Sequence, residues 1–240
     1  MWWRIGNLSH NPNGWPYGVA VTWAGTMRDM VSGEHYFTAD PAVAHERHEV
    51  VFTVADREFR LATASGVFSW RGLDPGTAVL LREAPLPDRE ATGALLDLGC
   101  GYGPITAVLA AAAPRATIYA VDVNQRALDL TRENTAGKNV VAVTPDEVPP
   151  SVRFAQIWSN PPIRVGKPEL HALLLRWLPR LADDGVAWLV VAKNLGADSL
   201  QRWLVEQGFT AERHANHKGF RIFKVQKKRS DSGTAVALNA

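Results

Sequence analysis

The sequence predicts an α/β protein with a doubly wound, mostly parallel sheet, helices on both faces of that sheet, and a small β-rich segment before it. After residue 93, short apolar runs of strand length alternate with segments of helical periodicity, which is typical of a parallel sheet covered by helices. Before that point, two runs of alternating apolar and polar residues meet at a polar turn, which indicates a β-hairpin between Glu49 and Thr63.

The expected elements follow each other in the order strand, turn, helix. Proline is well tolerated at the first helical position and asparagine is a good helix cap, so Pro104 and Asn124 predict two helix starts. Leucines and a tryptophan on one face predict the clearest helix, from Leu170 to Leu181. The predicted strands span 94–98, 117–121, 140–143, 155–158, 186–191, 210–214 and 220–225, and the other predicted helices span 104–113, 125–135 and 199–207. An antiparallel strand is expected near the C-terminal end.

Changes in composition and periodicity divide the chain into four parts. Residues 1–33 are rich in Trp, Gly, Asn and Pro without periodicity, which predicts an irregular extension, and Met27 and Met30 leave open whether this segment belongs to the native protein. Residues 34–88 are expected to form a small β-rich lead-in with further short strands at 66–69 and 78–81, joined by a turn at Asp74-Pro75-Gly76. Residues 89–226 form the expected main domain, and 227–240 the expected flexible tail.

Composition is that of an ordinary globular protein. The 240 residues are 46% hydrophobic and 21% charged, and no run approaches the roughly 20 apolar residues that a membrane span needs. Because Cys100 is the single cysteine, no internal disulfide forms, and a cytoplasmic location is expected. Scattered histidines predict no metal site, and a net charge of +2 permits nucleic-acid binding without arguing for it.

A glycine-rich turn, Asp97-Leu98-Gly99-Cys100-Gly101-Tyr102-Gly103, lies at a predicted strand-to-helix junction. Glycine lets the backbone approach a ligand closely, and such turns face the ligand crevice of open α/β sheets. Asp122 ends the next strand, from where a carboxylate accepts both hydroxyls of a ribose. These features alone fit a nucleotide dehydrogenase or a methyltransferase.

Two details favour the methyltransferase. The third glycine follows the second by two residues, not three, and Asp97 places a carboxylate where a diphosphate would be repelled. A cofactor with an amino group and a sulfonium suits that carboxylate better. Cys100 lies within the turn without an evident general base nearby, so we interpret it as a small packing residue and not as a nucleophile.

Ser159-Asn160-Pro161-Pro162 follows the fourth strand of the series. Two prolines fix φ and donate no N–H, which predicts a stiff turn whose carbonyl groups have no internal partners. The Asn160 side-chain oxygen and the Pro161 carbonyl are therefore expected to accept hydrogen bonds from a substrate –NH₂ and to direct its lone pair toward a methyl group. Such catalysis works by positioning and electrostatics.

These motifs resemble class I S-adenosylmethionine-dependent methyltransferases of the branch with an Asn-Pro-Pro motif. Over residues 33–226 the chain is most similar to the small-subunit ribosomal RNA guanine-N2 methyltransferase family, in a form with a single catalytic domain; the matching stretches are 33–37, 159–167 and 218–222. The resemblance implies a Rossmann-like, seven-stranded sheet, S-adenosyl-L-methionine as cofactor, guanine N2 as acceptor, and ribosomal RNA or the small ribosomal subunit as partner. It implies cofactor binding by Asp97, Gly99, Cys100, Gly101, Gly103, Asp122 and Val123, and catalytic roles for Asn160, Pro161 and Pro162.

The same resemblance implies further contacts. An acidic residue near the end of the third strand meets the adenine amino group in such enzymes; Asp146 and Glu147 are in range, and we favour Asp146. Ile163 stands where many members have Phe or Tyr against the target base, which leaves the base open. Ile163, Arg164 and Lys167 are the expected substrate-binding residues, and the two cations are either phosphate contacts or solvated loop charges.

Other acceptors and one other function stay open at this point. The Asn-Pro-Pro geometry also accepts a protein glutamine amide, an adenine N6 or a small-molecule amine. A non-catalytic RNA-binding or ribosome-assembly module with the same fold is the alternative of a different class. The glycines together with Asp122 and Asn160 argue against that module, because a decayed site has no physical need to keep them together.

Overall fold

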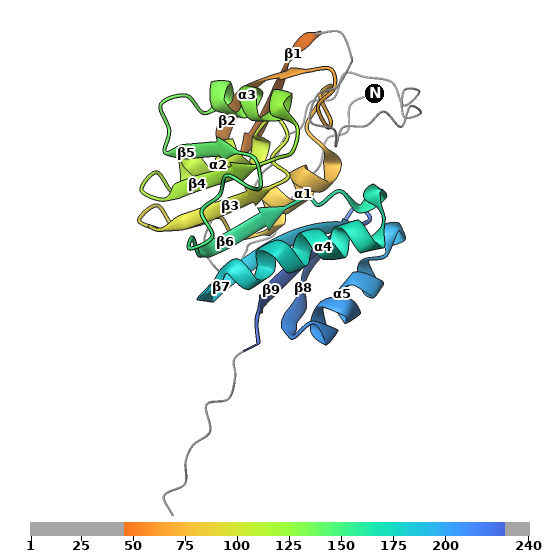
Figure 1. Ribbon diagram of the computed structural model, residues 1–240. Helices are drawn as coiled ribbons and strands as arrows, with labels where there is room; N and C mark the ends of the chain where they lie inside the picture. Colours follow the sequence, from red (N-terminus) through yellow and green to blue (C-terminus); the bar gives the residue numbers. More distant parts are fainter. Residues whose placement is uncertain (1–45, 229–240) are drawn as a thin grey trace, which may run out of the picture.

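The structure is a computed structural model that describes residues 46–228 (Figure 1). Predictions for residues 1–45 and 229–240 lie outside the described residues. The strands are β1 (Arg47–Val54), β2 (Arg57–Ala64), β3 (Ala94–Leu98), β4 (Thr117–Val121), β5 (Val140–Val143), β6 (Phe154–Ser159), β7 (Leu181–Ala192), β8 (Phe209–His217) and β9 (Phe220–Lys227). The α-helices are α1 (Pro75–Glu83), α2 (Pro104–Ala112), α3 (Gln125–Asn134), α4 (Lys167–Trp177) and α5 (Ala197–Glu206), with short 3-10 helices η1 (Ile163–Val165), η2 (Leu178–Arg180) and η3 (Lys193–Leu195).

The central sheet has seven strands in the order β5-β4-β3-β6-β7-β9-β8. Neighbouring strands from β5 to β7 pair in parallel, whereas β9 is antiparallel to both β7 and β8. This order confirms the predicted fold class, including the antiparallel strand near the C-terminal end. Strand order reverses between β3 and β6, and the ligand crevice of such sheets lies at the carboxyl ends of the strands on either side of that reversal. The glycine turn follows β3 and Asn160 follows β6, so both lie at this edge.

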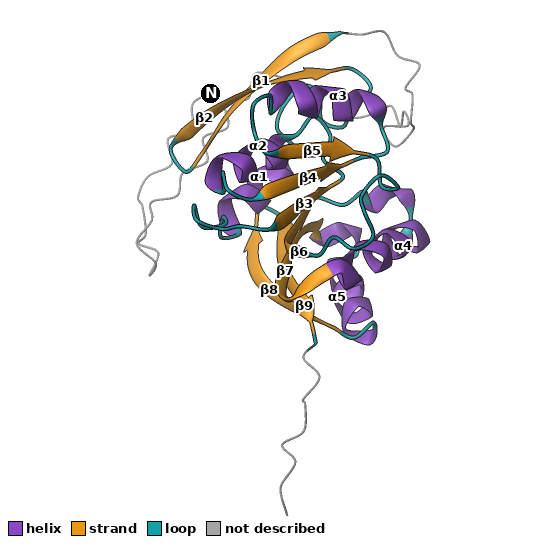
Figure 2. Cartoon of the chain, turned by 60° about the vertical axis from the view of Figure 1, so that its left-hand side comes forward, coloured by secondary structure: helices purple, strands orange, loops and turns teal. Residues whose placement is uncertain are grey.

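Helices cover both faces of the sheet, with α1, α2 and α3 on one face and α4 and α5 on the other (Figure 2). Alternate strand residues point to opposite faces, which β6 shows directly: the side chain of Trp158 belongs to the core under α1 and α2, and that of Ile157 to the core under α4. Both side chains are fully buried. The apolar runs of the sequence are therefore the central strands of a two-sided core.

The β1–β2 hairpin turns at Ala55 and Asp56, whose φ values of 47° and 58° place both residues in the left-handed region that a two-residue hairpin turn requires. Phe52 and Phe59 face each other across the hairpin, with ring centroids 5.4 Å apart. Their side chains share one continuous core with α2 and α3. The hairpin thus packs on α2, which follows the glycine turn, and on α3, which lies against Gly103 of that turn.

Some local predictions were wrong. Residues 78–81 are helical, because Asp74 caps α1 by accepting a hydrogen bond from the Thr77 N–H at 2.9 Å and Pro75 occupies the first turn. Residues 66–69 form turns instead of a strand. The helix predicted to reach Leu181 ends at Trp177, and Leu181 begins β7.

Within residues 46–228, no helix has the length and apolar character needed to cross a bilayer, and no three His, Cys, Asp or Glu side chains cluster in a way that could hold a metal ion.

Candidate cofactor and acceptor site

The glycine turn between β3 and α2 has a backbone that only glycine adopts without strain. The φ angles of Gly99, Gly101 and Gly103 are +77°, +56° and +90°. A Cβ at Gly99 or Gly101 would meet nothing within 4 Å, so the turn presents bare backbone to open space. A Cβ at Gly103 would lie 2.9 Å from Thr131 Oγ1, so that glycine serves close packing against α3.

Asp122 joins the glycine turn to the start of α3. Its Oδ2 accepts a hydrogen bond from the Gly101 N–H at 2.9 Å, and its Oδ1 accepts one from the Asn124 N–H at 2.9 Å. Asn124 in turn caps α3, as predicted, by accepting from the Ala127 N–H. Burial raises the pKa of the Asp122 carboxyl group, and these backbone donors oppose the shift. The carboxylate is thereby held in one orientation at the end of β4.

Asp97 lies completely buried beneath the turn. Its Oδ2 accepts hydrogen bonds from the Thr106 N–H at 2.9 Å and the Thr106 hydroxyl at 2.6 Å. Its Oδ1 has no hydrogen-bond partner among residues 46–228. Burial raises the pKa of the Asp97 carboxyl group to about 7; the Thr106 hydrogen bonds lower it and the Asp122 charge raises it further. An acidic group with an unused oxygen therefore lies under the turn.

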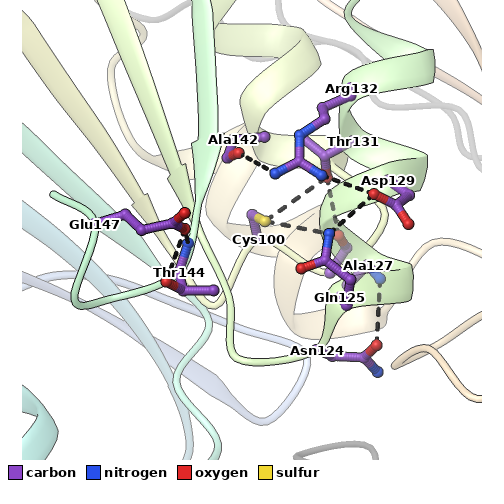
Figure 3. Close-up of polar contacts among 11 residues, drawn as sticks. Cys100, Asn124, Gln125, Ala127, Asp129, Thr131, Arg132, Ala142, Thr144 and Glu147 are labelled. Carbon is purple, nitrogen blue, oxygen red and sulfur yellow. Dashed lines mark hydrogen bonds and ion pairs between the residues drawn. The ribbon is translucent and has the colours of Figure 1, made fainter. Parts of the chain in front are cut away.

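Cys100 is buried within the turn, and its Sγ lies 3.6 Å from Thr131 Oγ1. A dashed line marks this contact in Figure 3. The Thr131 hydroxyl also donates a hydrogen bond to the Gly101 carbonyl at 2.9 Å. Burial raises the pKa of the Cys100 thiol well above its ordinary value, so the group stays neutral and non-nucleophilic. These contacts agree with the interpretation of the Cys100 side chain as a packing residue.

Asn160 is held from outside the Asn-Pro-Pro motif. Its Nδ2 donates hydrogen bonds to Asp74 Oδ1 at 2.7 Å and to Thr77 Oγ1 at 3.0 Å. No residue of the described chain donates a hydrogen bond to its Oδ1. The preceding Ser159 hydroxyl donates to the Leu98 carbonyl at 2.7 Å, which ties the end of β6 to the end of β3.

The two prolines are not free of internal partners, contrary to the expectation. The Pro161 carbonyl accepts a hydrogen bond from the Ile163 N–H at 2.8 Å, and the Pro162 carbonyl accepts one from the Val165 N–H at 3.3 Å. The turn satisfies its own carbonyls because η1 begins directly after the prolines. A carbonyl oxygen has a second lone pair, so the Ile163 contact leaves one acceptor position on the buried Pro161, which does not line the pocket described next.

A single pocket brings the two motifs together. Four of its lining residues are predicted site residues: Gly99, Cys100, Gly101 and Asn160. The other lining residues are Phe68, Ser69, Asp74, Thr77, Tyr102, Pro104 and Ile105. Sequence reasoning does not link Phe68, Ser69, Asp74, Thr77 or Ile105 to the site. Phe68 is 42% exposed. The one local signal for these residues was the Asp74-Pro75 pair, which marks a helix start as well as a turn.

The loop between β2 and α1, which carries Phe68, is attached to the glycine turn and to α3. The Tyr102 hydroxyl contacts the Gly72 carbonyl at 3.4 Å. The Asn124 side chain donates to the Gly66 carbonyl at 2.9 Å, and Arg126 donates to the Ser65 carbonyl at 2.7 Å. The lead-in thus contributes one wall of the pocket.

Other predicted residues lie elsewhere. Ile163 and Lys167 line a second pocket, between η1, α4 and α5, and do not line the first. The Arg164 side chain lies outside the described part of the structure. Asp146 forms an ion pair with Arg176 of α4 at 2.8 Å.

Two more residues considered for the cofactor site, Val123 and Glu147, follow β4 and β5 in the chain. Val123 is 45% exposed beside Asp122. Glu147 Oε2 accepts hydrogen bonds from the N–H and the hydroxyl of Thr144 (Figure 3).

Comparison with known proteins agrees with this geometry. Residues 58–224 match the methyltransferase small domain family. The chain is 34% identical over 200 residues to the uncharacterized protein YbxB of Bacillus subtilis, covering 81% of this chain and 98% of that protein. It is 37% identical over 148 residues to ribosomal RNA small subunit methyltransferase C of Shewanella sediminis and 29% identical over 212 residues to that of Shewanella oneidensis.

The chain spans 37% and 60% of the lengths of those two Shewanella proteins, and the matches cover 60% and 76% of this chain. Among solved structures, the T. thermophilus 16S rRNA N2 methyltransferase RsmC, in complex with AdoMet and guanosine, superposes with a TM-score of 0.62 at 21% identity, over 78% of this chain and 52% of that one. That likeness concerns the fold. The glycine turn follows β3, a carboxylate follows the next strand, and the family match covers most of the described residues. The chain therefore belongs to the methyltransferase small domain family of class I S-adenosylmethionine-dependent methyltransferases.

Proposed function

We propose that this protein methylates the exocyclic N2 of guanine in RNA of the small ribosomal subunit. The observation that carries the proposal is the pocket that joins the glycine turn to Asn160. Within it, Asn160 Oδ1 receives no hydrogen bond from the described residues while its Nδ2 is bound on the other side. A free acceptor beside a cofactor turn suits a substrate amine.

The residues present fit S-adenosylmethionine. Open space at Gly99 and Gly101 leaves room for a ligand against the backbone, and the partnerless buried Asp97 Oδ1 suits a cation. When bound, this cofactor supplies a methyl group attached to a positively charged sulfur. Asp122 would accept the ribose hydroxyls and exposed Val123 would cover the adenine.

The remaining cofactor assignments rest on the family pattern. We assign the Cys100 role to its backbone, because its thiol packs against Thr131. Gly103 lets α2 approach α3 closely. The contact to the adenine amino group stays assigned to Asp146, although its carboxylate bonds Arg176 and would have to exchange that partner.

Asn160 and Pro161 act on the acceptor by positioning. The Asn160 Oδ1 and the second lone pair of the Pro161 carbonyl accept the two N–H bonds of an –NH₂ group, which directs the nitrogen lone pair away from them and toward the methyl group. Pro162 stiffens the turn, because its ring fixes φ. Neither contact requires a proton to be removed before the methyl group is transferred.

Phe68 favours a planar base as the acceptor. Phe68 lines the same pocket as Asn160 and is 42% exposed. Stacking on an aromatic ring is worth about 1–3 kcal/mol per base. Phe68 therefore offers the aromatic face that Ile163 lacks, from a different part of the chain.

Guanine and ribosomal RNA are supported by the names of the relatives and by the resemblance of the motifs. Arg164 and Lys167, next in sequence to the Asn-Pro-Pro turn, are proposed to contact RNA phosphates. Ile163 is proposed to contact a nucleotide beside the target, because it lines the neighbouring pocket.

The test supplies the protein with methyl-labelled cofactor and with small ribosomal subunits, free RNA or ribosome-free protein extract, and then locates the label. We expect N2-methylguanosine in RNA. Asn160→Ala should keep cofactor affinity but lower kcat by about a hundredfold or more, as loss of a transition-state hydrogen bond does. Asn216→Ala, which truncates an exposed asparagine of β8, is the control and should behave as the native protein.

If the label is found in a glutamine amide, an adenine or a small amine, that group is the methyl acceptor and the guanine assignment is wrong. RNA binding without any incorporation of label would indicate the non-catalytic module. Native turnover by Asn160→Ala would refute the role of Asn160 itself.

A further inference from the structure

The side chain of Asn160 is useful to an acceptor amine only in one of its two amide orientations. With Oδ1 toward the pocket it accepts a hydrogen bond, whereas with Nδ2 toward the pocket it would oppose one N–H with another. The two orientations are nearly equal in shape. Some other group must therefore select between them.

We infer that Asp74 and Thr77 of the lead-in are positioning residues that fix this orientation. The inference rests on the proposed role of Asn160. Asp74 Oδ1 lies 2.7 Å and Thr77 Oγ1 lies 3.0 Å from Asn160 Nδ2. An ionised carboxylate only accepts hydrogen bonds, so the Asn160 atom that faces it must be the –NH₂ group. A flipped amide would place two acceptor oxygens at that distance.

The two positioning residues are themselves held in place. Asp74 Oδ1 also accepts the Thr77 N–H at 2.9 Å, as the N-cap of α1. Thr77 is 4% exposed, so little water competes for its hydroxyl. A Cβ at Gly76 would lie 3.0 Å from both Asp74 Oδ1 and the Phe220 ring, so glycine at this position leaves the carboxylate room.

Their place in the chain makes this role separate from cofactor binding. Asp74 and Asn160 are 86 positions apart, and Asp74 follows the hairpin, before the first strand of the cofactor-binding sheet. Asn160 Oδ1 points away from Asp74 and Thr77 because the Nδ2 of the same amide donates its hydrogen bonds to them. Loss of either positioning residue should therefore reduce turnover and leave cofactor affinity intact.

Matched substitutions separate orientation from helix capping. Asp74→Ser keeps a good N-cap residue but has a shorter side chain whose hydroxyl also donates, so it no longer selects the amide orientation. Asp74→Asn keeps an oxygen acceptor of the same length, and the Thr77 N–H, which donates to this oxygen, keeps the oxygen and not the new –NH₂ group toward Asn160. Thr77→Val removes the hydroxyl at nearly constant volume, and Thr77→Ser restores it.

We expect Asp74→Ser to lower kcat about twofold to tenfold, because an unselected amide is flipped for part of the time and is also less firmly positioned, and Thr77→Val to lower it about twofold. Asp74→Asn and Thr77→Ser should recover most of the activity. The dissociation constant of the cofactor should stay within about twofold of the native value in all four variants. Equal activity of Asp74→Ser and the native protein would overturn the inference.

A double-mutant cycle gives the sharper readout. In an Asn160→Ala background, Asp74→Ser should cause no further loss of kcat, because the amide that Asp74 orients is gone. The same loss in both backgrounds would show that Asp74 acts on the fold and not through Asn160.

One measurement needs no acceptor and so separates this inference from the proposed function. In ¹⁵N NMR spectra, the Asn160 side-chain –NH₂ protons should exchange with water slowly in the native protein and faster in Asp74→Ser and Thr77→Val. Slow exchange in a protein that methylates no RNA would leave the orientation role standing and remove only the guanine assignment. Fast exchange in the native protein would overturn the orientation role.

Discussion

Asp97 should make the stability of this protein fall as the pH rises toward neutrality. The group is fully buried, and burial raises its pKa from an ordinary 3.8 to about 7. Between those values the folded chain holds a proton that the unfolded chain has released. The folded state therefore binds more protons, and the free energy of unfolding decreases as the pH rises through this interval.

The size of the effect follows from the two pKa values. A rise from 3.8 to about 7 corresponds to about 4 kcal/mol of lost stability once both states are ionised. The loss should accrue at about 1.4 kcal/mol per pH unit between roughly pH 4.5 and 6.5, and should level off above about pH 7 to 8. Below about pH 3 the penalty is absent, because the group is protonated in both states.

Urea unfolding of the native protein and of Asp97→Asn across this pH range isolates the effect. The neutral amide does not titrate, and the shifts of groups that do not interact with Asp97, such as the lowered pKa of His217, cancel in the difference. The changed hydrogen bonds to Thr106 add an offset that does not depend on pH. The stability of Asp97→Asn relative to the native protein should therefore climb by about 4 kcal/mol from acidic to neutral pH. A difference that stays flat over this range would refute the reasoning.

Two further predictions concern the walls of the pocket. Phe68→Ala should raise the KM for the acceptor about tenfold, the worth of one stacked base, with little change in cofactor affinity, whereas Phe68→Tyr should retain native kinetics; an unchanged KM in steady-state assays would exclude the ring from acceptor binding. Gly103→Ala should lower the free energy of unfolding by about 2–3 kcal/mol, because it combines positive φ with a methyl group 2.9 Å from Thr131 Oγ1. Gly137→Ala, with φ of +74° and open space, is the control and should cost only about 1–2 kcal/mol in thermal or urea unfolding; equal losses would mean that the Thr131 contact is unimportant.

The main sheet could be predicted from local patterns. The strands expected at 94–98, 117–121 and 140–143 have those bounds in the structure. Buried parallel strands are short apolar runs, and the caps at Pro104 and Asn124 mark helix starts by their own backbone chemistry. Such signals need no information from distant residues.

The first helix could not be distinguished from a strand in this way. Ala78-Val79-Leu80-Leu81 is too short an apolar run to show a period. Packing of α1 against α2, β7 and β9 buries Val79, Leu80 and Leu81 and selects the helix. Asp74 then caps α1 and at the same time accepts a hydrogen bond from Asn160, which a turn at this place does not predict.

The sequence by itself determined the fold class, the glycine turn, Asp122 and the Asn-Pro-Pro turn, because each is a short motif at the end of a predictable strand. Only the tertiary structure decided what surrounds Asn160: the amide held by Asp74 and Thr77, the ring of Phe68, and the displacement of Ile163 and Lys167 to a second pocket. The reason is sequence distance. A hydrogen bond between residues 86 positions apart depends on how α1 packs on the sheet whose strand β6 precedes Asn160, and no local pattern contains that information.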